Sequence, residues 1–204
     1  ISEHPGIDKV SFTGSTEVGR EIVRASAGNL KRVTLELGGQ TPVIVLADAD
    51  LEAAVAGALQ GALLNSGQVC AAYSRFFVDR SRADEFAERC ARAVEQMRLG
   101  HGLEEGTELG PLVSEEHLQK VHGLVRQGVE AGAELLTGGE KADGELAAGN
   151  FFRPTVLHNV EPDHPTARNE VFGPVLSILP YDDPDQLASL ANSTEYGLAA
   201  SVWT

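Results

Sequence analysis

Hydrophobic positions along the chain alternate between the two-residue period of strands and the wider period of helices. Residues 8–12 alternate, Gly14 interrupts the pattern, and apolar residues resume at helical spacing over 18–23. From Leu51 to Leu63 the apolar residues keep the i, i+3, i+4, i+7 spacing of an amphipathic helix without a break. The pattern therefore predicts a strand, a tight turn and a helix at the start, and a buried helix over 51–63.

The rest of the chain continues this alternation of strands and helices. Strands are predicted over 33–37, 42–46, 75–78, 134–137, 151–160, 175–179 and 199–203. Helices are predicted from Ser81 onward, from Ser114 to about Ala131, and over 184–191. The strands at 33–37 and 42–46 are expected to form a buried pair, and the Gly-rich stretch 138–149 an exposed loop. Together these elements indicate an α/β fold with a mostly parallel open sheet flanked by helices.

Length and composition indicate a packed globular protein of 204 residues, 42% hydrophobic and 23% charged. Thirty acidic residues against 16 basic ones give a formal charge of −14, which is the wrong sign for binding nucleic acid or anionic lipid through general electrostatics. No apolar run approaches the roughly 18 residues of a membrane span. We expect no nucleic-acid or membrane partner, and any phosphate site must use backbone N–H groups.

Two cysteines, Cys70 and Cys90, are too few for a disulfide framework and lack the spacing of a metal site. We therefore expect no metal and a reducing, cytoplasmic location. The chain begins at Ile1 without a methionine or a leader. That start suggests a fragment or a processed form.

Cys70 lies in the sequence NSGQVC, directly after the predicted helix over 51–63 and in a loop where Gly67 permits close backbone approach. This placement suits a nucleophile, although a lone cysteine is also commonly a small buried core residue. Cys90 shares one helical face with Phe86, Val94 and Met97, so we assign it to the core.

Glu36 is a charged residue inside the apolar strand VTLEL, which ends at Gly38-Gly39. A buried carboxylate there would need a partner or a bound proton, and such an environment suits a general base. The sequence pattern fits equally well a glutamate that points outward from an edge strand.

Two further segments have features of binding loops. The stretch FTGSTEVG places two glycines and several hydroxyls at a strand-to-helix turn, a geometry that offers N–H groups to a phosphate, although Ser and Thr are also ordinary helix caps. It lacks the GxGxxG fingerprint and the Walker lysine. NEVFGPV, over residues 169–175, reads by itself as an exposed turn.

Taken in order, FTGSTEVG, LELGG, NSGQVC followed by SR, and NEVFGPV resemble the NAD(P)-dependent aldehyde dehydrogenases. The resemblance covers essentially the whole chain, and the 34 positions between Glu36 and Cys70 match the family spacing. It implies oxidation of an aldehyde to a carboxylic acid with NAD or NADP, through a cysteine thiohemiacetal and a thioester.

The resemblance also implies roles for individual residues. Cys70 matches the nucleophile and Glu36 the base that activates water. The implied cofactor contacts are Gly14 and Ser15 at the pyrophosphate, Leu37 beside the nicotinamide, and Glu170 and Phe172 at the nicotinamide ribose.

Several departures from the family pattern accompany this resemblance. Family subunits are more than twice as long, and their second oxyanion donor, an upstream asparagine, is not in this chain. Gln40 replaces a lysine common after LELGG. We expect residues 1–32 to be the last strand and helix of a Rossmann-like nucleotide-binding domain, and 33–204 the catalytic domain.

From these departures we expect the 204-residue chain alone to be inactive, and a complete enzyme to be a homo-oligomer. One alternative is a non-catalytic scaffold or binding module that retains the fold. Another is a relative that passes the thioester to coenzyme A, against which Glu36 argues because transfer to a thiol needs no water-activating base. The aldehyde and the choice between NAD and NADP stay open.

Overall fold

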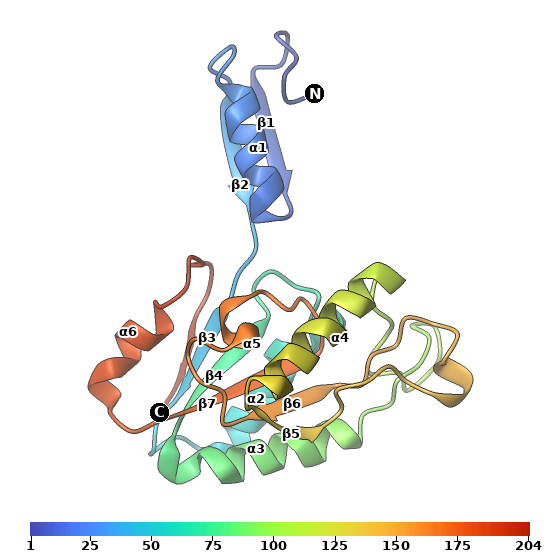
Figure 1. The fold of residues 1–204 in the computed structure, drawn as a ribbon, viewed down its shortest axis with the longest axis vertical. Coiled ribbons are helices and arrows are strands. Elements are labelled where there is room, and N and C mark those ends of the chain that lie inside the picture. The colour runs from blue at the N-terminus through green and yellow to red at the C-terminus, as the bar shows by residue number, and fades with distance from the viewer. The chain divides into compact units, whose positions relative to one another are not determined.

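The computed structural model describes residues 1–204, which form two compact units, Ile1–Gly39 and Gln40–Thr204. The first unit is a parallel β-α-β arrangement of β1 (Lys9–Thr13), α1 (Thr16–Ser26) and β2 (Arg32–Glu36) (Figure 1). Its two strands pair in parallel over their whole length. The helix between them is the crossover that parallel pairing requires.

Helix α1 begins where the sequence provides a cap. Ser15 is the N-cap, and its Oγ accepts the Val18 N–H at 3.3 Å. Ile22 is the one buried hydrophobic side chain of this unit. Gly19 lets the Leu37 side chain approach, because a Cβ there would lie 2.7 Å from Leu37 Cδ2. The unit therefore has a small apolar core.

The second unit is built on a six-stranded sheet in the order β5-β6-β7-β4-β3-β8 (Figure 1). Neighbouring strands are parallel, apart from β5, which is antiparallel to β6. Its strands are β3 (Thr41–Val45), β4 (Tyr73–Asp79), β5 (Glu134–Thr137), β6 (Thr155–His158), β7 (Val175–Tyr181) and β8 (Ser201–Trp203).

Helices and short 3-10 turns connect these strands. The helices are α2 (Leu51–Leu63), α3 (Arg80–Glu95), α4 (Glu115–Glu130), α5 (Pro165–Arg168) and α6 (Leu187–Ala191). The 3-10 turns are η1 (Leu64–Gly67), η2 (Gly144–Leu146) and η3 (Pro184–Gln186). The three long helices begin at side-chain caps, Asp50, Asp79 and Ser114.

Strand β4 shows how the sheet is buried on both faces. Phe76 and Val78 belong to the hydrophobic cluster that includes α2 and α3, whereas Phe77 between them belongs to the cluster that includes α4. Successive side chains of a strand point to opposite faces, so helices cover both sides of the sheet. The predicted α/β class, with a mostly parallel sheet flanked by helices, is confirmed.

The strands over 33–37 and 42–46 are not a pair, which corrects one expectation. Strand β2 pairs with β1, and β3 pairs with β4 and β8. Alternate residues of β3 are buried, whereas alternate residues of β2 are exposed, so only β3 is the buried strand that was expected. Because β2 pairs with β1, it belongs to the compact unit Ile1–Gly39.

Three other predicted elements are shorter than expected. The strand predicted over 199–203 covers only Ser201–Trp203. The strand predicted over 151–160 is regular only over Thr155–His158. Pro154 cannot donate to a strand ladder, and Phe152 makes only an isolated bridge to Lys141. The helix predicted over 184–191 divides into η3 and α6.

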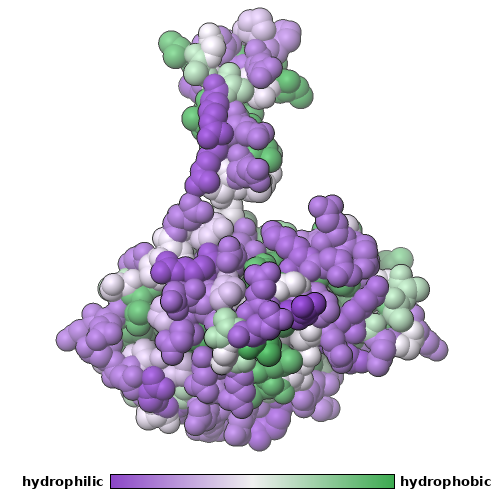
Figure 2. Space-filling view, in the orientation of Figure 1, coloured by the Kyte–Doolittle hydropathy of each residue, from purple (hydrophilic) through white to green (hydrophobic).

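Hydrophilic side chains make up most of the surface in view on each unit, with hydrophobic residues in small groups between them (Figure 2). None of the helices combines the length and the apolar character needed to cross a membrane.

Candidate active site

Cys70 occupies a tight turn between η1 and β4. The Ala72 N–H donates to the Val69 carbonyl at 3.0 Å, which places Cys70 and Ala71 at the centre of the turn. Thr41 Oγ1, at the start of β3, donates to the Ala71 carbonyl at 3.2 Å. The thiol is half-buried and belongs to no disulfide. The sequence therefore folds here into a turn that is tied to the sheet.

The main-chain N–H of Cys70 has no hydrogen-bond acceptor within the protein. Central residues of a β-turn direct their N–H groups away from the hydrogen bond that closes the turn. An N–H beside a nucleophilic sulfur is suited to stabilise negative charge on an oxygen of the group that the sulfur attacks.

Cys90 has the opposite environment. It is fully buried in the cluster of α2, α3 and the sheet. Burial raises the pKa of the Cys90 thiol to about 12, so at neutral pH it stays protonated and unreactive. Its expected place in the core is confirmed.

The turn before Cys70 has an unusual backbone. Asn65, Ser66 and Gly67 have φ values of 52°, 57° and 74°, three successive residues in the left-handed region. A Cβ on Gly67 would lie 2.1 Å from the Gly173 carbonyl oxygen. Only glycine fits at position 67, and the close approach brings the NSGQVC and NEVFGPV segments into contact.

Phe172 lies beside this contact with a φ of 55°. The His117 Nε2 donates to the Phe172 carbonyl at 2.6 Å, and the two rings meet edge-on with centroids 5.8 Å apart. Glu170, two residues earlier, is half-buried. The second unit thus brings Cys70, Glu170 and Phe172 onto neighbouring loops.

The other predicted site residues lie in the first unit. Gly14 N–H donates to the Glu36 carbonyl at 3.0 Å, which joins the β1–α1 turn to the end of β2. Ser15 caps α1, and Leu37 packs against that helix at Gly19. The Glu36 side chain is exposed, as the edge-strand interpretation expected.

Gln40 is a buried connection point of the second unit. Its Nε2 donates to the carbonyls of Asn169 at 2.6 Å and Thr166 at 3.2 Å, and its Oε1 accepts the Ser74 hydroxyl. The position therefore holds the start of β3 against the beginning of the NEVFGPV segment. A neutral amide serves this role through both its donor and its acceptor.

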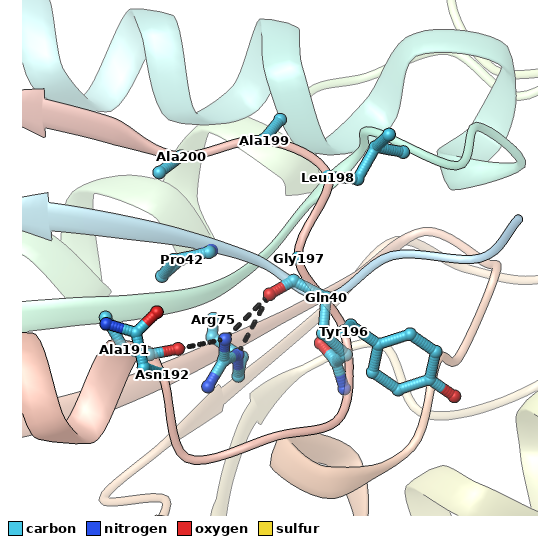
Figure 3. Close-up of a pocket in the computed structure, with 10 residues that line it drawn as sticks. All are labelled: Gln40, Pro42, Arg75, Ala191, Asn192, Tyr196, Gly197, Leu198, Ala199 and Ala200. Atoms are coloured by element: carbon cyan, nitrogen blue, oxygen red, sulfur yellow. Dashed lines mark hydrogen bonds between the residues drawn. The ribbon is translucent and has the colours of Figure 1, made fainter. Parts of the chain in front are cut away.

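Arg75 lies next to Gln40 and is 1% exposed. Its Nη2 donates to the carbonyls of Gln40 and Ala191, each at 2.8 Å (Figure 3). Burial, with a smaller contribution from the nearby Arg168 charge, lowers the pKa of Arg75 to about 10, so the guanidinium is charged at neutral pH. Gln40 and Arg75 line a cavity of about 330 Å³ with residues from the 191–200 segment (Figure 3).

Three residues of this region were not assigned a role from the sequence. Gln68 lies within NSGQVC and Arg75 in the SR dipeptide that follows it, so both residues belong to motifs that were visible in the sequence. His117 had no local signal, because its partner Phe172 is 55 positions away. No group of three or more His, Cys, Asp or Glu side chains is arranged to hold a metal ion.

The chain matches known proteins over its whole length. The sequence profile of the Aldehyde dehydrogenase family matches residues 1–204. Betaine aldehyde dehydrogenase of Agrobacterium fabrum is 45% identical over 204 residues, and that of Bacillus subtilis is 44% identical over 205. These matches cover 100% of this chain but 41% and 42% of the relatives.

Solved structures agree with the sequence matches. The NAD⁺ complex of aldehyde dehydrogenase from Bacillus cereus superimposes with a TM-score of 0.96 at 45% identity. Betaine aldehyde dehydrogenase from Staphylococcus aureus in complex with NAD⁺ gives 0.96 at 38% identity. Each covers all of this chain, which spans 41% and 40% of those proteins. This chain belongs to the aldehyde dehydrogenase family.

Proposed function

We propose that this chain provides the catalytic thiol of an NAD(P)-dependent oxidation of an aldehyde to a carboxylic acid. The observation that carries the proposal is Cys70 itself, a half-buried thiol in a turn anchored to β3, with its own main-chain N–H unpaired. Family membership and the matching order of the four motifs support it.

In the proposed reaction the Cys70 thiolate adds to the aldehyde carbon and forms a C–S bond. The Cys70 N–H donates to the oxygen that becomes negatively charged in this thiohemiacetal. Loss of hydride from the same carbon leaves a thioester on Cys70. Glu36 then takes a proton from water, the hydroxide attacks the thioester carbon, and the acid leaves as the thiol is regenerated.

The residues of the first unit fit a dinucleotide phosphate. Gly14 and Ser15 are exposed at the start of α1, where N–H groups of the first turn are available to an anion. We propose that these residues hold the pyrophosphate, that Leu37 lies beside the nicotinamide, and that Glu170 and Phe172 hold its ribose. When bound, NAD(P)⁺ supplies the hydride acceptor.

We further propose that residues 1–32 belong to a nucleotide-binding domain and that a complete enzyme is a homo-oligomer. The chain spans about two fifths of its relatives' length. The second oxyanion donor of the family is not in these 204 residues, and loss of one such donor costs about 10²- to 10³-fold in rate. The chain by itself is therefore expected to be inactive.

The proposal is tested by exchanging this chain for the matching segment of the Bacillus cereus enzyme, to which it is 45% identical. NAD(P)⁺ reduction with a panel of aldehydes is then measured. We expect turnover that Cys70→Ala abolishes. In Glu36→Gln we expect one burst of reduced cofactor followed by slow turnover, reduced about 10²- to 10⁴-fold, because an amide cannot accept the proton.

Cys90→Ala is the matched control for the thiol. We expect it to retain turnover, because Cys90 lies in the core. A folded chimera that binds cofactor but oxidises no aldehyde would favour the scaffold alternative. Acceleration by coenzyme A, with an acyl-coenzyme A product, would favour the transferase alternative.

A further inference from the structure

We propose that Gln68 is a positioning residue for Cys70, and that its side-chain amide holds the thiol-bearing turn against the main chain of residues 110–113. The inference rests on the proposed function only in taking Cys70 as the nucleophile. Its test measures the thiol itself and does not require turnover.

The turn needs external support because its backbone is strained. Residues other than glycine enter the left-handed region at an energetic cost, because the Cβ crowds the following carbonyl oxygen, and asparagine tolerates this region better than serine. Asn65 and Ser66 both do so immediately before Gly67. Such a conformation persists only where surrounding contacts fix it.

Gln68 supplies these contacts from both ends of its amide. Its Nε2 donates to the Asn65 carbonyl at 3.1 Å and to the Pro111 carbonyl at 3.4 Å. Its Oε1 accepts the Val113 N–H at 2.9 Å. The turn is also closed by its own atoms, because the Gln68 N–H donates to the Asn65 carbonyl and the Asn65 Nδ2 donates to the Gln68 carbonyl, each at 3.2 Å. What the Gln68 side chain adds is a tie from this closed turn to a segment more than 40 positions away.

Ser66 adds a parallel connection to the same segment. Its hydroxyl donates to the Gly110 carbonyl at 2.9 Å. The hydroxyl of Ser66 and the amide of Gln68 thus hold successive parts of residues 110–113. Cys70 follows Gln68 by two residues, so these bonds set where the thiol turn begins.

The segment that receives these bonds is itself fixed. Leu112 is 2% exposed, and its N–H donates to the Asn150 carbonyl at 2.9 Å. Ser114 follows as the N-cap of α4, accepting the His117 N–H at 3.1 Å. His117 in turn holds the Phe172 carbonyl. The Cys70 turn and the Phe172 loop are therefore supported by the same helix start.

The test compares Gln68→Met with Gln60→Met in the 204-residue chain. Methionine keeps the length of the side chain and removes its hydrogen bonds, and Gln60 is exposed on α2. The rate of Cys70 alkylation by iodoacetamide is measured against pH by peptide mapping, in the folded and the urea-unfolded chain. Hydrogen exchange of residues 110–113 is followed in parallel.

In Gln68→Met we expect faster hydrogen exchange at 110–113. We also expect the rate of Cys70 alkylation to change by about threefold or more, toward the rate of the unfolded chain. Cys90 should stay unlabelled, and Gln60→Met should match the wild type. The proposal would be overturned by an unchanged rate of Cys70 alkylation in Gln68→Met, or by equal Cys70 rates in the folded and the unfolded wild type. Labelling of Cys90 in parallel with Cys70 would also overturn it.

Discussion

At the scale of single residues, the two thiols of this chain show how burial decides chemistry. Cys70 and Cys90 are the same functional group, yet one lies in a half-buried turn and the other in a closed core. The thiolate is the reactive form, and a low-dielectric core disfavours it. Reactivity is therefore assigned by position in the fold.

Brief treatment with iodoacetamide at about pH 8 should label Cys70 and leave Cys90 intact. The pKa of Cys90 is raised to about 12 by burial, so its proton is retained well above that pH. Peptide mapping measures both sites, and labelling in urea, where both should react, is the control. Preferential labelling of Cys90 in the folded chain would contradict the assignment.

Gln40 should matter for stability because its side chain is buried and each of its hydrogen bonds is buried or partly buried. Gln40→Ala leaves the Ser74 hydroxyl and the Thr166 and Asn169 carbonyls without partners, and we expect a loss of about 1–3 kcal/mol. Urea unfolding followed by the fluorescence of Trp203, the single tryptophan, measures it.

Gln127→Ala is the matched control for that change. Gln127 is exposed on α4, so its truncation should alter the free energy of unfolding by less than about 0.5 kcal/mol. Equal stabilities of the two variants would show that the Gln40 hydrogen bonds contribute nothing.

At the scale of elements, the connection from α2 to β4 depends on a glycine at position 67. We expect Gly67→Ala to lower the free energy of unfolding by more than about 1 kcal/mol, because a Cβ would lie 2.1 Å from the Gly173 oxygen and the residue has a φ of 74°. Urea unfolding provides the measurement.

Gly123 in α4 is the contrasting glycine, since a Cβ there has no heavy atom within 4 Å. Gly123→Ala should raise stability by about 0.5–1 kcal/mol, because alanine loses less backbone freedom in a helix. If Gly67→Ala were as stable as Gly123→Ala, the close approach at Gly67 would not be what requires glycine.

Elements with a complete hydrophobic period were predictable from the sequence. The buried helix over 51–63 matches α2 at both ends, because its apolar stripe is uninterrupted and Asp50 caps it. The pairing partners of β2 and β3 were not predictable, because hydrophobic periodicity identifies a strand but not the strand beside which the chain places it. Pro154 explains the shortened β6, and it was visible in the sequence.

The same division holds for the site. Cys70 and Glu36 were proposed from local motifs and a family resemblance, and their roles stay predictions. The supports of the Cys70 turn were beyond local reasoning, because the bond from Gln68 to Val113 spans 45 positions. Contacts at such separation become visible only when the fold places both segments together.

At the scale of the whole molecule, the two units differ in how much they bury. Both large hydrophobic clusters lie in the second unit, whereas Ile22 is the one buried hydrophobic residue of the first. A two-stranded sheet with one helix is marginally stable by itself. The first unit should therefore open more readily than the second.

Hydrogen exchange should reveal this difference directly. We expect amides of β1 and β2 to exchange several orders of magnitude faster than those of β4 and β7, whose opening approaches global unfolding. Peptides from the surface helix α3 serve as an internal reference within the second unit. Equal protection of residues 9–36 and of β7 would show that the first unit is stabilised by contacts outside its own core.

The central claim is that Cys70 forms the thioester from which the acid is released. In the Bacillus cereus chimera that carries Glu36→Gln, the reaction with aldehyde and NAD⁺ is quenched in acid after the burst, and the acyl group is located by peptide mass spectrometry. The account predicts one acyl group, on Cys70, in an amount equal to the reduced cofactor of the burst. An acyl group on Cys90, or reduced cofactor with no acylated Cys70, would contradict it.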